Sequence, residues 1–99
     1  MARVVITGPA DADVAGIIAY LAEKAGSQVA ARYFGAFDAL YDRLADLPAI
    51  GPPRPALGPD ARIALVHPFV VVYDYVDDTI IVLRVLHGSR HITRELLDR

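Results

Sequence analysis

The fold is decided by the stretch Ile80-Ile-Val-Leu-Arg-Val-Leu-His-Gly-Ser-Arg-His-Ile92. Apart from Arg84, residues 80–86 are all apolar, which predicts a strand buried on both faces and central to its sheet. An arginine in such a strand is costly unless its guanidinium finds a partner, for example Asp74 or backbone carbonyls. Gly88 can end the strand. Polar side chains therefore gather at one end of the most buried strand, either as a functional site or as the polar end of a structural element; they are Arg84, His87, Arg90 and His91.

Outward from this stretch, hydrophobic periodicity predicts two helices and three further strands. The strands cover residues 3–7, 61–66 and 69–76, in addition to 79–86, and the helices cover residues 10–25 and 28–46. Asp77-Asp78 has the length of a two-residue hairpin turn, and His67-Pro68 makes a second short turn. The last three strands therefore form an antiparallel meander.

The connections between these elements carry signals of their own. Gly26 predicts a left-handed end to the first helix and Ser27 an N-cap for the second, so the two helices form a tight hairpin. Asp11 and Asp13 lie where the positive end of a helix dipole favours acids. Five prolines from Pro48 to Pro59 predict a stiff, extended, non-repetitive loop. The sequence of the C-terminal tail, residues 92–99, predicts a short helix that docks through Ile92, Leu96 and Leu97.

The order β-α-α-β-β-β, with a short C-terminal helix, predicts a two-layer α+β fold within one domain over residues 1–99. The helical hairpin packs on one face of a small, mainly antiparallel sheet. The apolar stripe of the second helix carries two phenylalanines and two tyrosines, which are core residues in the simplest interpretation.

Composition limits the function classes. The chain has 99 residues, a formal net charge of −2 and a mean hydropathy of +0.36. A domain this small has too little interior for so many apolar side chains, which indicates an apolar surface reserved for a partner; an excess of small alanines and valines is the alternative explanation. The negative charge argues against a generally basic, DNA-binding face. The absence of cysteine excludes thiolate metal sites, and Asp77 and Asp78 are turn formers, so no metal or other cofactor is expected.

Several local features, in this order, resemble the RelE/ParE superfamily of toxins from bacterial type II toxin–antitoxin pairs, and the ParE-like, or plasmid-stabilisation, branch most closely. They are Gly51 with Arg54, Arg62, His67-Pro68-Phe69, Tyr73, and Arg84-Val-Leu-His-Gly-Ser-Arg90. The order of the predicted elements is also that of the superfamily. The resemblance thus covers nearly the whole chain.

The resemblance implies one of two activities. RelE-like members cleave mRNA in the ribosome, and here Arg62 and Arg84 would supply the cations and His87, or else His91, the base. ParE-like members are not known as nucleases and are generally taken to inhibit DNA gyrase by protein–protein contact. Lys24 is the only lysine, and Arg90 stands where nuclease members often carry tyrosine, so the ParE-like activity is favoured. Its target-contact candidates are Arg84, His87, Arg90 and His91, together with the tail; a degenerate member that only binds antitoxin is a third hypothesis.

The resemblance also implies a cytoplasmic protein with a ParD-like antitoxin as partner. The C-terminal segment of such an antitoxin folds along the helical hairpin and the sheet of the toxin and buries apolar side chains there. We expect the exposed members of one set of residues to line this groove: Ile17, Leu21, Tyr33, Phe37 and Tyr41. Neither a membrane segment nor direct DNA binding is expected.

Overall fold

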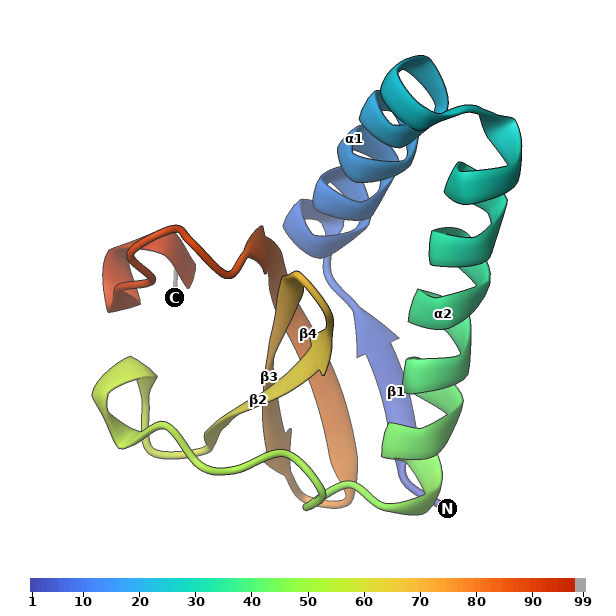
Figure 1. The fold of residues 1–99 in the computed structure, drawn as a ribbon. Coiled ribbons are helices and arrows are strands. Elements are labelled where there is room, and N and C mark those ends of the chain that lie inside the picture. The colour runs from blue at the N-terminus through green and yellow to red at the C-terminus, as the bar shows by residue number, and fades with distance from the viewer. Residues whose placement is uncertain (98–99) are drawn as a thin grey trace.

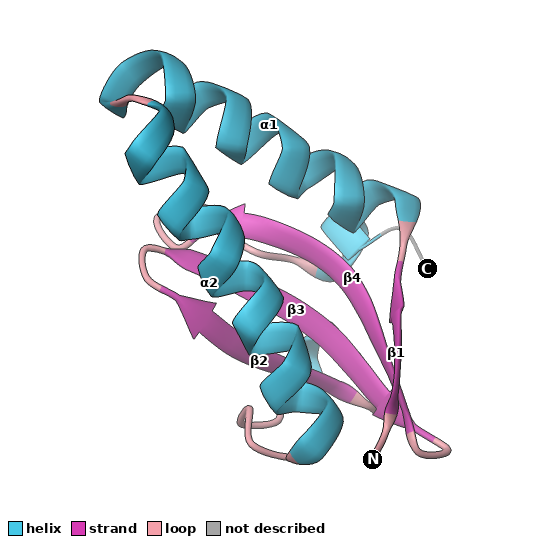
Figure 2. Ribbon diagram, turned by 90° about the vertical axis from the view of Figure 1, so that its right-hand side faces the viewer, coloured by secondary structure: helices cyan, strands magenta, loops and turns pink. Residues whose placement is uncertain are grey.

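A helical hairpin covers one face of a four-stranded sheet in the computed structural model, which describes residues 1–97 (Figures 1 and 2). The last two residues of the predicted tail lie outside this range. The elements are β1 (Arg3–Ile6), α1 (Gly8–Ala25), α2 (Ser27–Asp46), β2 (Ala61–Val66), β3 (Phe69–Val76) and β4 (Thr79–His87), with short 3-10 helices η1 (Pro55–Leu57) and η2 (Arg94–Leu97). The predicted fold class and element order are confirmed.

The sheet has the strand order β1-β4-β3-β2. Strands β2, β3 and β4 form the predicted antiparallel meander, and β1 pairs with β4 in parallel. The prediction that residues 80–86 form an interior strand is therefore confirmed. The prediction that this strand is the most buried is wrong, because residues 69–73 of β3 are all buried while β4 alternates between buried and half-buried positions.

Two hydrophobic clusters explain this difference. The larger cluster lies between the hairpin and the sheet and includes Phe37, Leu44 and Tyr73. The smaller cluster lies on the opposite face, where Leu57 of η1 and Leu97 of η2 cover Val70 and Val72. Strand β3 is thus covered on both sides, and the predicted docking of the C-terminal helix through Leu97 is confirmed.

A bulge in β4 decides where Arg84 points. In the pairing with β3, Val72 faces Arg84 but Tyr73 faces Val82, so one extra residue lies in β4 between them. An extra residue reverses the alternation of side chains along a strand. As a result Val82 and Val85, rather than Val82 and Arg84, enter the core under the helices. Thr7 braces the bulge, because its hydroxyl lies 2.8 Å from the Val82 carbonyl oxygen.

The ends of the helices follow the predicted signals in part. The Thr7 side chain caps α1, accepting a hydrogen bond from the Ala10 amide. Gly26 ends α1 with φ 96° and ψ 163°, a conformation essentially restricted to glycine rather than the predicted left-handed helical one. The predicted Ser27 cap is wrong, since the N-cap position of α2 is Gly26, which has no side chain to offer. Asp77 and Asp78 both have positive φ, as a two-residue type I′ hairpin turn requires.

Candidate functional site

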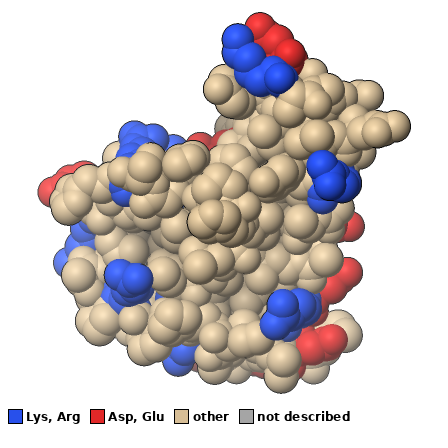
Figure 3. Space-filling model, in the orientation of Figure 1, with Lys and Arg blue, Asp and Glu red and all other residues tan. Residues whose placement is uncertain are grey.

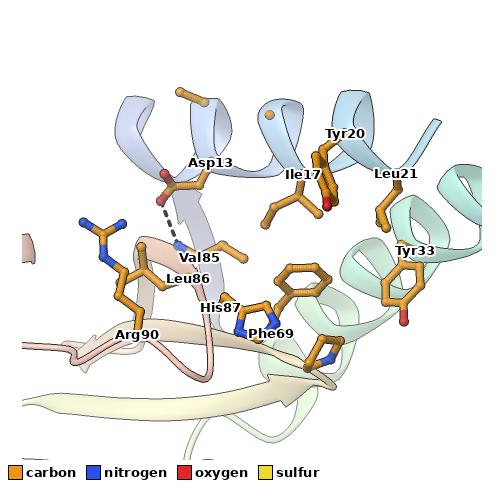
Figure 4. Close-up of a pocket in the computed structure, with 13 residues that line it drawn as sticks. Asp13, Ile17, Tyr20, Leu21, Tyr33, Phe69, Val85, Leu86, His87 and Arg90 are labelled. Carbon is orange, nitrogen blue, oxygen red and sulfur yellow. Dashed lines mark hydrogen bonds between the residues drawn. The ribbon is translucent and has the colours of Figure 1, made fainter. Parts of the chain in front are cut away.

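A groove of about 680 Å³ opens between the helical hairpin and the C-terminal end of β4 (Figure 4). Ile17, Tyr20 and Leu21 of α1 form one wall, and Tyr33 of α2 closes one side. The floor comes from the start of β3 and the end of β4, with Phe69, Val85, Leu86, His87 and the following Arg90. Gly16 leaves space in the helical wall, because it has no side chain. The groove is therefore apolar along its length, with polar groups near the end of β4.

Phe69 organises the floor of the groove. Its ring lies edge-on to Tyr33 and to His87, with centroid separations of 5.8 Å in both cases, and it tilts against Phe37 at 5.9 Å. Edge-to-face packing of this kind fixes ring orientations. Phe69 thus connects α2 to the end of β4 and gives the groove a preformed aromatic base.

His87 has a defined hydrogen-bonding pattern at the end of β4. Its Nδ1 accepts the backbone N–H of Ser89 at 3.0 Å and the Ser89 hydroxyl at 2.7 Å. An amide can only donate, so the neutral ring carries its hydrogen on Nε2. Because the ring itself is exposed, this Nε2–H is available as a donor at the groove surface.

Arg84 is bound to the rest of the protein. Its Nε and Nη2 donate to the two carboxylate oxygens of Asp13 at 2.6 and 3.0 Å, and Nη1 donates to the Leu96 carbonyl at 2.7 Å. The same carboxylate accepts the Val85 amide at 2.9 Å, as Figure 4 shows. The backbone-carbonyl alternative for Arg84 is confirmed, and the acid that pairs with it is Asp13. This cluster ties α1, β4 and η2 together.

Arg62 holds the proline-rich loop. Its Nη1 donates to the carbonyls of Ala49 at 3.1 Å and Gly51 at 2.7 Å. Nearby, the fully buried Tyr73 hydroxyl accepts the Gly51 amide at 3.0 Å and donates to the Pro48 carbonyl at 2.9 Å. Burial raises the pKa of Tyr73, while the Gly51 amide and the Arg62 charge act in the opposite direction. These hydrogen bonds fix the proline-rich loop to the sheet. The prediction that the whole loop is non-repetitive is wrong for residues 55–57, which form a 3-10 turn.

The structure separates the five predicted antitoxin-contact residues into two groups. Ile17, Leu21 and Tyr33 line the groove. Phe37, with 1% of its surface exposed, lies in the core beneath it, so it is not an exposed contact. Tyr41 is half-buried and packs against the same core.

Other residues of the groove were not predicted from the sequence, among them Asp13, Tyr20, Phe69 and Leu86. Tyr20 follows Ile17 by three positions and so lies on the same helical face, a spacing that the sequence already contained. Phe69 and Leu86 could not be placed without the strand register.

The remaining basic candidates lie after β4. Arg90 and His91 are exposed, and with Arg54 they line a recess of about 370 Å³ on the loop side of the sheet. Arg90 also borders the groove. On the face shown in Figure 3, cations are separated by wide neutral areas, so this face is not generally basic.

Residues 1–97 show neither a metal-ligand cluster nor a membrane-spanning helix. Within this range, no group of three His, Cys, Asp or Glu side chains is placed to hold a metal ion. No helix in the same range has the length and apolar character needed to cross a membrane.

Comparison with known proteins gives concordant results. Residues 4–92 match the family model described as the ParE toxin of the type II toxin–antitoxin system parDE. The chain is 28% identical to Toxin ParE3 of Caulobacter vibrioides over 96 residues, which cover 97% of this chain and 96% of that protein. It also resembles a solved structure titled as the chromosomal ParDE TA system from P. aeruginosa, with a TM-score of 0.64 and 23% identity over 88% of this chain and 96% of the other. At that identity, the structural match speaks for the fold alone.

Proposed function

The chain belongs to the ParE toxin family of type II toxin–antitoxin systems, and from this premise we propose that it inhibits DNA gyrase through protein–protein contact in the cytoplasm. We further propose that a cognate ParD-like antitoxin neutralises it. In this proposal three exposed side chains contact the target: His87, the last residue of β4, and Arg90 and His91, which follow it.

The observation that carries the proposal is the way in which Arg62 and Arg84 are bound. A ribonuclease of the RelE type needs cations that converge on one phosphate and stabilise its developing charge. Arg62 instead donates to two loop carbonyls, and Arg84 to a carboxylate and a carbonyl. Both cations are thus engaged in holding the fold. This favours a contact surface over a catalytic site.

We propose that the C-terminal segment of the antitoxin occupies the groove. A preformed apolar groove can accept the apolar face of a segment that is disordered when free. Ile17, Leu21 and Tyr33 would contact this segment directly. Phe37 would act only by supporting Phe69 from below.

The experiment compares two activities of the purified chain. We expect it to inhibit DNA supercoiling by gyrase and to leave mRNA intact in a translating extract. The double variant Arg90→Ala/His91→Ala should weaken inhibition about tenfold or more, because arginine is enriched among the few residues that carry most of the binding energy of an interface. Arg3→Ala, an exposed cation on β1, is the matched control.

Two results would contradict this proposal. Ribosome-dependent mRNA cleavage that is lost in His87→Ala would assign the RelE-like activity instead. Normal growth on expression without antitoxin would assign a degenerate member that only binds antitoxin. Deleting residues 92–99 is not a clean test of target contact, because Leu97 is buried and the Leu96 carbonyl binds Arg84.

A further inference from the structure

One end of the groove carries a positive charge that the described residues do not neutralise. From this we propose that the antitoxin segment in the groove places a carboxylate side chain against Arg90, next to the apolar side chains that fill the rest. This inference rests on the proposed function, since it names the chemistry of the segment that the groove would bind.

The charges around the groove lead to this assignment. Asp13 is the one acid among the groove-lining residues, and both of its oxygens already accept hydrogen bonds from Arg84. The charge of Asp13 is thus matched within the protein. Arg90 adds a second positive charge at the groove, and within residues 1–97 no acid forms an ion pair with it. The local formal charge is therefore +1.

The hydrogen-bonding groups at this end agree with the charge. The Arg90 guanidinium offers only donors. His87 offers Nε2–H, because its Nδ1 is occupied by Ser89. The backbone amide of Arg90 donates to the His87 carbonyl at 3.0 Å, which fixes the turn that carries both side chains. A carboxylate can accept hydrogen bonds from donors of this kind, whereas a lysine or arginine would meet the like charge of Arg90.

The rest of the groove defines what surrounds the carboxylate. Tyr20, which is 60% exposed, and the half-buried Ile17 and Leu21 present apolar surface along one wall. In Figure 4 these side chains point into the groove from α1, and Arg90 rises from the opposite side at the end that holds Asp13. A matching segment is thus amphipathic, with an apolar stripe and an acid at the end that meets Arg90.

The test takes as antitoxin the protein encoded by the neighbouring gene. It measures the dissociation constant of the complex between this antitoxin and the purified chain. Arg90→Glu should weaken binding about tenfold at low salt, because attraction becomes repulsion, and less at high salt. Arg3→Glu makes the same change in net charge outside the groove and should stay within about twofold. Replacing the matching acid of the antitoxin by lysine should restore binding to the Arg90→Glu variant but weaken binding to the unchanged chain.

A third variant separates failure of this inference from failure of the proposed function. Tyr20→Ala removes exposed apolar surface from the groove wall without opening the core and should weaken binding whatever the charge pattern. If Tyr20→Ala weakens binding and Arg90→Glu does not, the charge assignment is wrong and the groove remains the docking site. Two results would overturn both this inference and the proposal that the antitoxin segment occupies the groove. One is that neither variant weakens binding, and the other is that the groove joins two copies of this chain in sedimentation experiments.

Discussion

The interface between helices and sheet has a closed end and an open end. Both ends carry tyrosine and arginine side chains, which form internal hydrogen bonds at the closed end and are exposed at the open end. At the closed end, where α2 runs into the proline-rich loop, Tyr73 and Arg62 donate to backbone carbonyls and Gly51 fits beneath them. At the open end, which is the groove, Tyr20 is largely exposed and Arg90 has no ion pair within residues 1–97. Polar groups bonded internally stabilise a fold, whereas groups left at an apolar groove are available to a partner. Changes at the closed end should therefore alter stability, and changes at the open end should alter binding.

The largest expected loss of stability comes from Gly51→Ala. A methyl group at this buried position would overlap the Ile63 carbonyl and lie 2.7 Å from the Tyr73 hydroxyl. Because the Ile63 obstacle is backbone, the loop must move and lose its hydrogen bonds. We expect the free energy of unfolding to fall by about 3 kcal/mol or more. Thermal unfolding followed by circular dichroism should then show a melting temperature lower by roughly 12 °C or more.

Gly35→Ala is the matched control for this substitution. Gly35 lies inside α2, and an added methyl group there meets no atom within 4 Å apart from its chain neighbours and the backbone of its own helix. Alanine is the better helix former by about 0.5–1 kcal/mol, so this variant should be more stable than the unchanged chain. Equal melting temperatures for the two alanine variants would contradict the close packing of the loop against the sheet.

The next largest loss of stability is expected for Asp13→Asn. Asp13 is the exception among the residues of the open end, because its side chain is bonded within the protein. Asp13 borders the open end but is committed internally through its bidentate pair with Arg84, and both side chains are largely buried, with 17% and 20% exposed. Removing the charge leaves Arg84 without its carboxylate and should cost about 2 kcal/mol of stability in urea unfolding. Antitoxin binding should not weaken, because the groove becomes more positive.

Asp11→Asn serves as the control for Asp13→Asn. Asp11 is exposed in the first turn of the same helix, where the helix dipole favours a carboxylate. Its replacement should cost only about 0.3–1 kcal/mol. A loss at position 13 no greater than at position 11 would show that the pair with Arg84 adds nothing to stability.

Sequence reasoning succeeded where the signals were local. The apolar run of residues 80–86, the glycine at position 26 and the two aspartates at 77–78 each specify one element or turn through their own chemistry. The interior position of β4 followed from its composition. These features do not depend on which distant segment packs against them.

The groove depended on contacts between distant segments, and there sequence reasoning failed in part. Asp13 and Arg84 are 71 positions apart, so neither residue indicates the other. The bulge that turns Arg84 out of the core arises from the pairing of β4 with β3 and has no signal within residues 80–86. Tyr33 and Phe37 share one helical stripe, and only their positions over the sheet place one in the groove and the other in the core.

The smallest expected effects come from removing one hydroxyl from each of two tyrosines. The Tyr73 hydroxyl makes two hydrogen bonds at the closed end, so Tyr73→Phe should cost about 1–2 kcal/mol and leave the Gly51 amide without its partner. The buried Tyr41 hydroxyl has no hydrogen-bond partner within residues 1–97. Tyr41→Phe should therefore be neutral or stabilising by up to about 1 kcal/mol. Urea unfolding at pH 7 should thus give changes of opposite sign for the same substitution.

At alkaline pH, both tyrosines should make the stability of the fold fall as the pH rises. Burial raises the pKa of both above the usual value of about 10, and for Tyr41 the charges of Asp11, Asp38 and Asp13 add to the effect. Above that pH the unfolded chain loses these protons while the folded chain keeps them, so stability is complete below pH 10 and falls as the pH rises further. Each Tyr→Phe variant should lose less stability between pH 9 and pH 11 than the unchanged chain. A pH profile unaltered by either substitution would mean that neither hydroxyl is shielded from water in the folded protein.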